Sequence, residues 1–177
     1  MTKSLIKLIK NIRINILKKT FQAQSSHIGS CFSIVELLAV LYFRKLKKKD
    51  TFILSKGHAA LALYCTLFEK KLLSKLELDS YGKNGSNLMS HVSHKVRNIE
   101  FSTGSLGHGF SASIGMALGL KSSPPCNVFT LIGDGESNEG SIWEGAMLAS
   151  HLSLNNLTAI LDYNKIQSFG RTNDVIN

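Results

Sequence analysis

The sequence predicts an α/β fold, a parallel sheet flanked by helices, and two apolar runs carry this prediction. Val128–Ile132 is short, continuous and rich in branched side chains, as expected of a strand that is buried on both faces of a parallel sheet. Leu157–Leu161 is a second run of this kind, and the segment between them has apolar residues near helical spacing from Glu139 onward. A strand, a helix and a strand in succession are typical of two parallel strands joined by a crossover helix.

A basic amphipathic helix is predicted over residues 1–19. Apolar residues repeat there at helical spacing with lysines between them, namely Leu5, Leu8, Ile12 and Ile16. A polar loop over residues 21–30 presents His27, and a second helix is expected from Ile34 to about Leu46 with Ser33 as its N-cap. A strand is expected next at Thr51–Leu54, and a turn at 55–58 leads into a buried or intersubunit helix through about Leu73. An irregular segment at Ser74–Glu100 and a glycine-rich turn at Thr103–Gly109 follow. A helix at Phe110–Leu120 and a loop at Ser122–Asn127, which contains both prolines, complete the order.

Length and composition predict one soluble globular domain over residues 1–177. The apolar content of 44% and the mean hydropathy of +0.06 exclude a disordered chain. The longest apolar run, Leu37–Phe43, is too short to span a bilayer. The three cysteines, Cys31, Cys65 and Cys126, are odd in number and far apart, which indicates neither a disulfide framework nor a zinc site.

The net charge of +9 is concentrated in the first fifty residues. That part holds eleven Lys or Arg against Glu36 and Asp50, whereas the remainder holds ten against ten. A basic arm can bind nucleic acid or an acidic membrane, but the apolar spacing within it favours a helix docked on the domain. A mitochondrial presequence is disfavoured because only Arg13 and Arg44 are arginines in this part. The expected location is the cytoplasm, with neither nucleic acid nor membrane as a partner.

Oxygen donors are expected to gather where the two predicted strands end. Gly133-Asp134-Gly135 follows the first run, and its glycines allow a sharp turn close to a ligand. The second run delivers Asn164 and the backbone carbonyl of Ile166 to the same edge of the sheet, where ligands bind in open α/β proteins. Mg²⁺ and Ca²⁺ prefer carboxylate, amide and carbonyl oxygens. These donors, beside a helix N-terminus that favours anions, therefore predict a site for a diphosphate held through a divalent cation.

The segments LIGDGESNEGSIWE and AILDYNKIQSFGR resemble the thiamine-diphosphate motif of transketolases, and the resemblance covers almost the whole chain. It implies a pyrophosphate-binding domain that holds thiamine diphosphate, with Asp134, Asn164 and Ile166 as ligands of Mg²⁺ or Ca²⁺. It also implies that Asp134, Gly135, Glu139 and Asn164 bind the cofactor. Glu139 resembles the glutamate that links the two cofactor sites of a dimer, although a first-turn residue that satisfies the helix dipole is the structural alternative.

Three histidines lie in segments that resemble the histidine turns of the family. His27 in SSHIGS, His58 in SKGHAA and His91 in MSHVSHKV are thereby implied as catalytic residues, and His58 also as a cofactor-binding one. His94 is a rival for His91, because the proline that follows the histidine in many transketolases is missing here. Zinc binding by His91 and His94 is disfavoured because no second ligand pair stands nearby.

The turn STGSLGHG resembles the segment of the family that contacts the aminopyrimidine ring of the cofactor. The resemblance implies that the backbone of Gly104 and Leu106 makes this contact. His108 stands where many members have glutamine, so its role stays open, with a surface position as the alternative.

The segments HKVRNIEFSTGSLGHG and DYNKIQSFGR most resemble the corresponding segments of the separate N-terminal subunits of split transketolases. The resemblance implies transfer of a two-carbon ketol unit from a ketose to an aldose, or their phosphates. A C-terminal subunit with a pyrimidine-binding domain would complete the site in a homo- or heterotetramer, and the chain alone is expected to be inactive. Thirteen residues follow Asn164, so the domain is expected to be incomplete at its C-terminal end, with an uncovered sheet edge.

Three other functions stay open from the sequence. One is a non-catalytic cofactor-binding remnant or interaction protein of the same fold. Another is a different thiamine-diphosphate enzyme, such as a deoxyxylulose-phosphate synthase or the α-subunit of an oxo-acid dehydrogenase, the latter disfavoured by the histidine turns. The third is a nucleic-acid-binding module that uses the basic arm. No residue identifies the ketose, the aldose or the pathway.

Overall fold

The structure, a computed structural model, describes residues 3–122 and 126–176. It divides into two compact units. Unit 1 contains the chain up to Leu46 and from His58 to Ser102, and unit 2 contains Lys47–Gly57 and the chain from Thr103 onward. The single domain over residues 1–177 therefore stays a prediction. None of the described helices is at once long and apolar enough to cross a bilayer.

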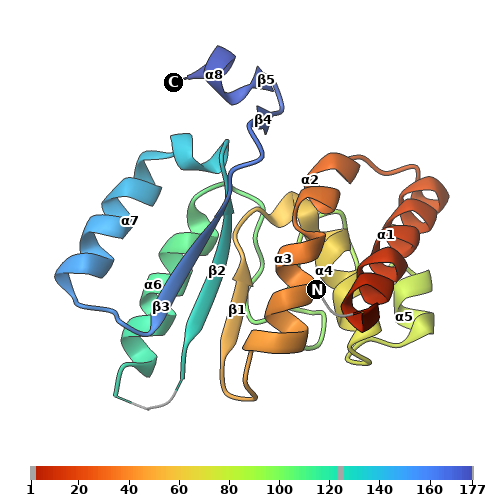
Figure 1. Cartoon of the computed structure of the whole chain (residues 1–177), viewed down its shortest axis with the longest axis horizontal. Helices are drawn as coiled ribbons and strands as arrows, with labels where there is room; N and C mark the ends of the chain where they lie inside the picture. The colour runs from red at the N-terminus through yellow and green to blue at the C-terminus, as the bar shows by residue number, and fades with distance from the viewer. Residues whose placement is uncertain (1–2, 123–125, 177) are drawn as a thin grey trace. The chain divides into compact units, whose positions relative to one another are not determined.

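Unit 2 is built on a sheet of three parallel strands. They are β1 (Thr51–Leu54), β2 (Val128–Gly133) and β3 (Leu157–Asp162), in the order β1-β2-β3 (Figure 1). The central strand β2 is mostly buried along its length, as its apolar run predicts. The predicted parallel α/β arrangement is confirmed, and the predicted strand ranges are met to within one residue.

Two helices of unit 2 form its apolar core with β2. They are α6 (His108–Leu120) and α7 (Gly140–His151), which follow the predicted helical segments closely. The core cluster consists of Phe110, Ile114, Ala117, Val128, Ile132, Ile142 and Leu154. A Cβ on Gly145 would lie 2.8 Å from Ile114 Cδ1, so α7 approaches α6 closely because this position carries no side chain.

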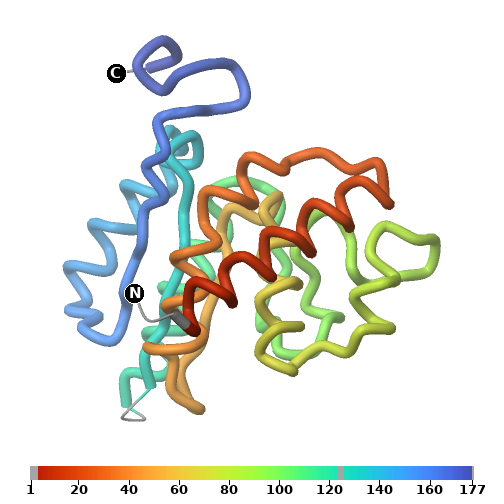
Figure 2. The backbone as a smooth tube through the Cα atoms, turned by 45° about the vertical axis from the view of Figure 1, so that its right-hand side comes forward, coloured from red at the N-terminus to blue at the C-terminus, as the bar shows by residue number. Residues whose placement is uncertain are grey.

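The strand β3 lies at the edge of the described sheet, and its side chains are largely exposed, with Leu161 47% exposed. Beyond it, β4 (Ile166–Gln167) and β5 (Gly170–Arg171) form a short antiparallel pair that leads into α8 (Thr172–Val175). Figure 2 shows this blue segment turning back on itself after β3.

Unit 1 is helical. Its elements are α1 (Lys3–Ala23), α2 (Ile28–Ser33), α3 (Val35–Val40), a π-helical turn η1 (Leu41–Lys45), α4 (Ala60–Glu69) and α5 (Lys75–Asp79). A 3₁₀ turn η2 (Gly57–Ala59), whose first residue belongs to unit 2, precedes α4. The apolar stripe of α1 is buried at Leu5, Ile9, Ile12 and Ile16, which confirms a docked amphipathic helix. The helix runs to Ala23, beyond the predicted end at residue 19. The helix α4 is buried on nearly all sides, as its composition predicts.

Three sequence predictions in unit 1 are wrong. Ser33 caps no helix, because it ends α2 and its Oγ donates to the Ser30 carbonyl at 3.0 Å. The helical stretch instead begins at Ile28, after His27 in a left-handed conformation, and a break at Ile34 divides it. The helix that begins at Ala60 ends at Glu69 and not near Leu73.

The prediction of an irregular segment over Ser74–Glu100 is wrong at its start. Ser74 and Glu77 form a capping box in which each side chain accepts from the backbone N–H of the other, and this starts α5. The Ser-x-x-Glu signal is present in the sequence. Of the loop Ser122–Asn127, residues 123–125 lie outside the described residues.

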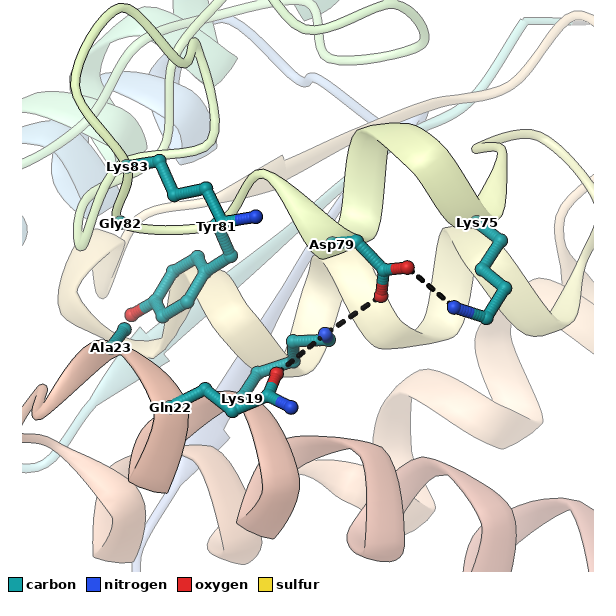
Figure 3. Close-up of a pocket in the computed structure, with 8 residues that line it drawn as sticks. All are labelled: Lys19, Gln22, Ala23, Lys75, Asp79, Tyr81, Gly82 and Lys83. Carbon is teal, nitrogen blue, oxygen red and sulfur yellow. Dashed lines mark hydrogen bonds and ion pairs between the residues drawn. The ribbon is translucent and has the colours of Figure 1, made fainter.

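An ion-pair cluster joins α1 to α5 in unit 1 (Figure 3). The Lys19 ammonium, nearly buried, donates to Asp79 Oδ1 at 2.7 Å and to Gln22 Oε1 at 2.8 Å, and Lys75 pairs with the other oxygen of Asp79. These side chains line a cavity of about 540 Å³ together with Ala23, Tyr81, Gly82 and Lys83. Because Lys19 and Lys75 already bind a carboxylate, the cluster explains how two helices are held together and does not indicate a ligand site.

Asp79→Asn is expected to destabilise the protein at neutral pH and to differ less from wild type in acid. Hydrogen bonds from Lys19 and then Lys75 lower the pKa of Asp79 from 3.8 to about 2. A carboxyl group whose pKa is lower in the folded than in the unfolded state stabilises the protein at pH values above its unfolded-state pKa. This stability is lost as the pH falls from about 4 to about 2. Urea unfolding across that range measures it. A constant offset between the two proteins would contradict the prediction, and Asp174→Asn, at an exposed aspartate, is the control.

Candidate functional site

The strands β2 and β3 end side by side in unit 2, and each is followed by an oxygen donor. Gly133 pairs with Asp162 in the parallel register, so Asp134 and Asn164 follow adjacent strand ends. Asp134 is only 6% exposed. Its Oδ1 accepts from the Gly135 N–H at 2.9 Å and its Oδ2 accepts from the Thr172 hydroxyl at 2.7 Å. A nearly buried carboxylate is thus held in one orientation by a backbone donor and a side-chain donor.

The second strand end is held by a turn and by an ion pair. Asn164 Oδ1 accepts from the Ile166 N–H at 2.9 Å, and Asn164 Nδ2 donates to Asp162 Oδ2 at 3.3 Å. The same Asp162 oxygen accepts from the ammonium of Lys56, which is 2% exposed, at 2.7 Å. Lys56 therefore compensates the buried charge of Asp162. The same ion pair also holds the Asp162 carboxylate to which Asn164 Nδ2 donates.

Two of the predicted cation ligands, a carboxylate and an amide, follow adjacent strand ends, and their oxygens are of the type that divalent cations prefer. The described residues contain no group of three or more His, Cys, Asp or Glu side chains that could hold a metal ion by themselves. Gly135 lies beside Gln167, because a Cβ on Gly135 would be in van der Waals contact with that side chain, 3.4 Å from its Oε1. Gln167 Nε2 is buried without a hydrogen-bond partner in the described part of the chain. An anion bound beside this turn would satisfy such a donor.

The glycine-rich turn is also part of unit 2, and it is hydrogen-bonded to strand β1 and to Glu136 in the turn that follows β2. Thr103 Oγ1 donates to the Leu54 carbonyl at 2.7 Å, and the Gly107 N–H donates to Glu136 Oε1 at 2.8 Å. Gly107 adopts φ +83° as the residue before α6, a conformation that favours glycine. Gly104 and Leu106 lie within the stretch that these two bonds anchor.

Glu139 is exposed and is the residue immediately before α7. Its side chain makes no capping hydrogen bond to that helix. His108 is also exposed, at the first position of α6.

Unit 1 brings the three predicted catalytic histidines together. The ring centroid of His27 lies 5.4 Å from that of His58 and 5.9 Å from that of His91. His94 is engaged elsewhere, because its Nδ1 and its backbone nitrogen lie 2.7 and 2.9 Å from Ser102 Oγ. The structure therefore places His91, and not His94, beside His27.

Burial, followed by the charge of His27, lowers the pKa of His91 below its ordinary value of 6.5. A histidine with a lowered pKa is neutral at physiological pH and can accept or donate a proton or a hydrogen bond.

A comparison with protein families identifies the family of the chain. The family model of the transketolase thiamine diphosphate-binding domain matches residues 4–177. The chain belongs to the transketolase family.

Relatives within this family include two that are subunits of transketolases. The chain is 38% identical over 175 residues to a subunit of the apulose-4-phosphate transketolase of Phocaeicola vulgatus, with 93% of the chain and 62% of the relative covered. It is 43% identical over 160 residues to a 6-deoxy-6-sulfo-D-fructose transketolase subunit of Clostridium sp., with 84% and 58% covered. The chain thus spans about three fifths of the length of these relatives.

Full-length transketolases match over a smaller share of their length. Human transketolase is 40% identical over 166 residues, with 88% of the chain and 27% of the relative covered. The solved structure of transketolase from Leishmania mexicana superposes on this chain with a TM-score of 0.90 at 26% identity. The match covers all of this chain and 30% of the Leishmania chain. The pyrophosphate-domain fold implied by the resemblance is therefore confirmed.

Sequence reasoning missed four residues around the strand ends. Lys56 lies in the SKGH segment and Glu136 follows the GDG turn, so both were near recognised motifs. Thr172 and Gln167 gave no signal, because the first reaches Asp134 from 38 residues away and the second lies beside Gly135 only in the folded chain.

Proposed function

We propose that the chain is the thiamine-diphosphate-binding subunit of a transketolase-type enzyme, which transfers a two-carbon ketol unit from a ketose to an aldose or their phosphates. The observation that carries this proposal is the pair of adjacent strand ends with Asp134 and Asn164, in a chain that matches the transketolase family over residues 4–177.

The cofactor end of the site would be held by residues of unit 2. Asp134, Asn164 and the carbonyl of Ile166 are proposed to ligate Mg²⁺ or Ca²⁺, which binds the diphosphate. Gly135 allows the diphosphate to approach the backbone, and the backbone of Gly104 and Leu106 is proposed to contact the aminopyrimidine ring. When bound, thiamine diphosphate supplies the chemistry that stabilises a carbanion next to the cleaved carbon–carbon bond.

The histidine cluster of unit 1 is proposed to serve the sugar. Imidazole nitrogens of His27, His58 and His91 can hydrogen-bond hydroxyl groups and move protons to or from an oxygen. His58 is also proposed to contact the cofactor. A neutral His91 can accept a proton at physiological pH, whereas a charged one cannot.

A partner subunit with a pyrimidine-binding domain is proposed to complete the enzyme in a tetramer in the cytoplasm. Two relatives are themselves named as transketolase subunits, and their names specify sugar substrates, which supports the proposal and the class of substrate. Glu139 is exposed beside α7, where Trp143 and Met147 are 63% and 68% exposed. Large exposed apolar side chains next to a functional carboxylate favour a protein interface on this helix.

Ketol transfer is expected only when the chain is combined with such a partner. The purified chain with thiamine diphosphate and Mg²⁺ should give no product from a ketose phosphate and an aldose phosphate, since the pyrimidine-binding domain and its glutamate are proposed to belong to the partner subunit. Addition of a C-terminal transketolase subunit should restore turnover in a coupled assay. Turnover by the isolated chain would refute the division of the site, and cofactor binding without turnover in the presence of the partner would favour a non-catalytic protein.

A further inference from the structure

Glu136 is a buried carboxylate that no proposed step of the reaction uses. It lies in the 3₁₀ turn η3 (Glu136–Asn138), two residues after Asp134, and is 2% exposed. Among the described residues no lysine, arginine or histidine forms an ion pair with it. Burying a charge without a counterion costs free energy unless hydrogen-bond donors compensate it. The donors that surround the Glu136 carboxylate therefore explain how the fold tolerates it.

Three donors converge on this carboxylate from three segments of unit 2. Its Oε1 accepts from Ser55 Oγ at 2.5 Å and from the Gly107 N–H at 2.8 Å, and its Oε2 accepts from the Gly133 N–H at 3.2 Å. Ser55 Oγ in turn accepts from the Phe110 N–H at 2.9 Å. The segments are the residue after β1, the end of the glycine-rich turn with the first residues of α6, and the end of β2.

These segments carry the two ends of the proposed cofactor site. Gly133 immediately precedes Asp134, the proposed cation ligand, and Gly107 ends the turn that contains Gly104 and Leu106, the proposed contacts of the aminopyrimidine ring. The Glu136 side chain therefore accepts hydrogen bonds from both of these segments.

We infer that Glu136 is a positioning residue for the cofactor: its carboxylate clamps the glycine-rich turn to the end of β2, so that both ends of thiamine diphosphate meet a preformed site. This inference rests on the proposed function for the identity of the ligand, whereas the clamp itself is a property of the free chain. Residues that orient ligating groups typically contribute about 10- to 100-fold to affinity.

Glu136→Gln removes the clamp with little change of shape. A glutamine has one acceptor oxygen, whereas the carboxylate has two. If the amide oxygen faces Gly107 and Ser55, its NH₂ group opposes the Gly133 N–H; if it faces Gly133, the NH₂ group opposes the Gly107 N–H. One glycine N–H therefore loses its acceptor in either orientation.

Isothermal titration of the full chain with thiamine diphosphate at saturating Mg²⁺ tests the effect on the ligand. Glu136→Gln is expected to bind about 10- to 100-fold more weakly, and Ser55→Ala, which keeps the carboxylate and both glycine donors, is expected to bind more weakly than wild type by a smaller factor. Thr130→Val is the matched control, because the Thr130 hydroxyl is buried in β2 without a partner among the described residues. Its affinity should equal that of wild type.

Two measurements without cofactor test the clamp itself. Amide hydrogen exchange of Gly107 or Gly133 should be at least about tenfold faster in Glu136→Gln, because one of these N–H groups loses its acceptor. Trp143, the single tryptophan, donates from Nε1 to the Ser137 carbonyl in η3 at 2.8 Å, so its emission should shift as well. Neither change is expected in Thr130→Val.

The outcomes separate the inference from the proposed function. Wild-type affinity in Glu136→Gln, even with a lower Tm, would overturn the positioning role and leave a structural one. If wild type itself binds no thiamine diphosphate, the proposed function fails, and unchanged amide exchange would overturn the clamp independently. If Glu136→Gln does not fold, Ser55→Ala decides, and wild-type affinity in that variant would overturn the inference.

Discussion

Asp134→Asn is expected to abolish Mg²⁺-dependent binding of thiamine diphosphate while the fold is kept. The substitution removes the only charge among the three proposed cation ligands, and hydrogen bonds to a charged group contribute more than those to a neutral one. The amide can still meet the Gly135 N–H and the Thr172 hydroxyl, which now hold the carboxylate at 2.9 and 2.7 Å. The affinity should fall at least about 100-fold, at the upper end of the range for residues around a metal.

A thermal shift measures this prediction. Saturation at about 100 times the Kd stabilises a folded protein by about 2.7 kcal/mol, so wild type with cofactor and Mg²⁺ should melt at a clearly higher temperature than wild type alone. Asp134→Asn should show no such rise. Asp174→Asn, an exposed aspartate in α8 of the same unit, should behave as wild type. An equal rise in Asp134→Asn would mean that the cation is held elsewhere.

Gly57→Ala is expected to cost about 3 kcal/mol of unfolding free energy or to prevent folding, which is at the upper end of the cost of overpacking. A Cβ on Gly57 would lie 2.6 Å from the carbonyl carbon, the carbonyl oxygen and Oγ1 of Thr103. Thr103 cannot retreat, because its Oγ1 donates to the Leu54 carbonyl at 2.7 Å. The clash is therefore with backbone and with a side chain that is itself tied to β1.

Gly115→Ala is the matched control with the opposite sign. Nothing lies within 4 Å of a Cβ built on Gly115, which is exposed in the interior of α6. Alanine there should stabilise the protein by about 1 kcal/mol, because glycine is unfavourable inside a helix. Urea unfolding of both variants measures the pair, and wild-type stability in Gly57→Ala would show that the turn at Thr103 can move.

Local sequence patterns were sufficient where a segment's own composition decides its structure. The strands β2 and β3 are short apolar runs, and the helix between them shows helical spacing, so their ranges and parallel pairing could be predicted. The capping box of Ser74 and Glu77 is an equally local signal, and it predicts the start of α5. The helical turn α2 before Ile34 was not predictable, since it contains Gly29, Ser30 and Ser33, and glycine and serine are not favoured inside helices.

Choices between equivalent residues needed the fold. His91 and His94 stand in the same short segment, and the resemblance implies His91 but leaves His94 as a rival. The structure places the His91 ring 5.9 Å from that of His27, whereas His94 bonds to Ser102. The catalytic role of His91 stays a prediction, but its location beside a second histidine does not depend on the resemblance.

The sequence by itself determined the fold class, the family and the two strand ends that carry Asp134 and Asn164, because each depends on residues that are neighbours in the chain. Only the tertiary structure decided what holds them: Thr172 on Asp134, Lys56 on Asp162, and Glu136 between the glycine-rich turn and β2. Thr172 and Asp134 lie 38 residues apart in the sequence, and Lys56 and Asp162 lie 106 residues apart. Hydrogen bonds and ion pairs act over a few ångströms in space, so such pairings arise only when the sheet brings distant segments together.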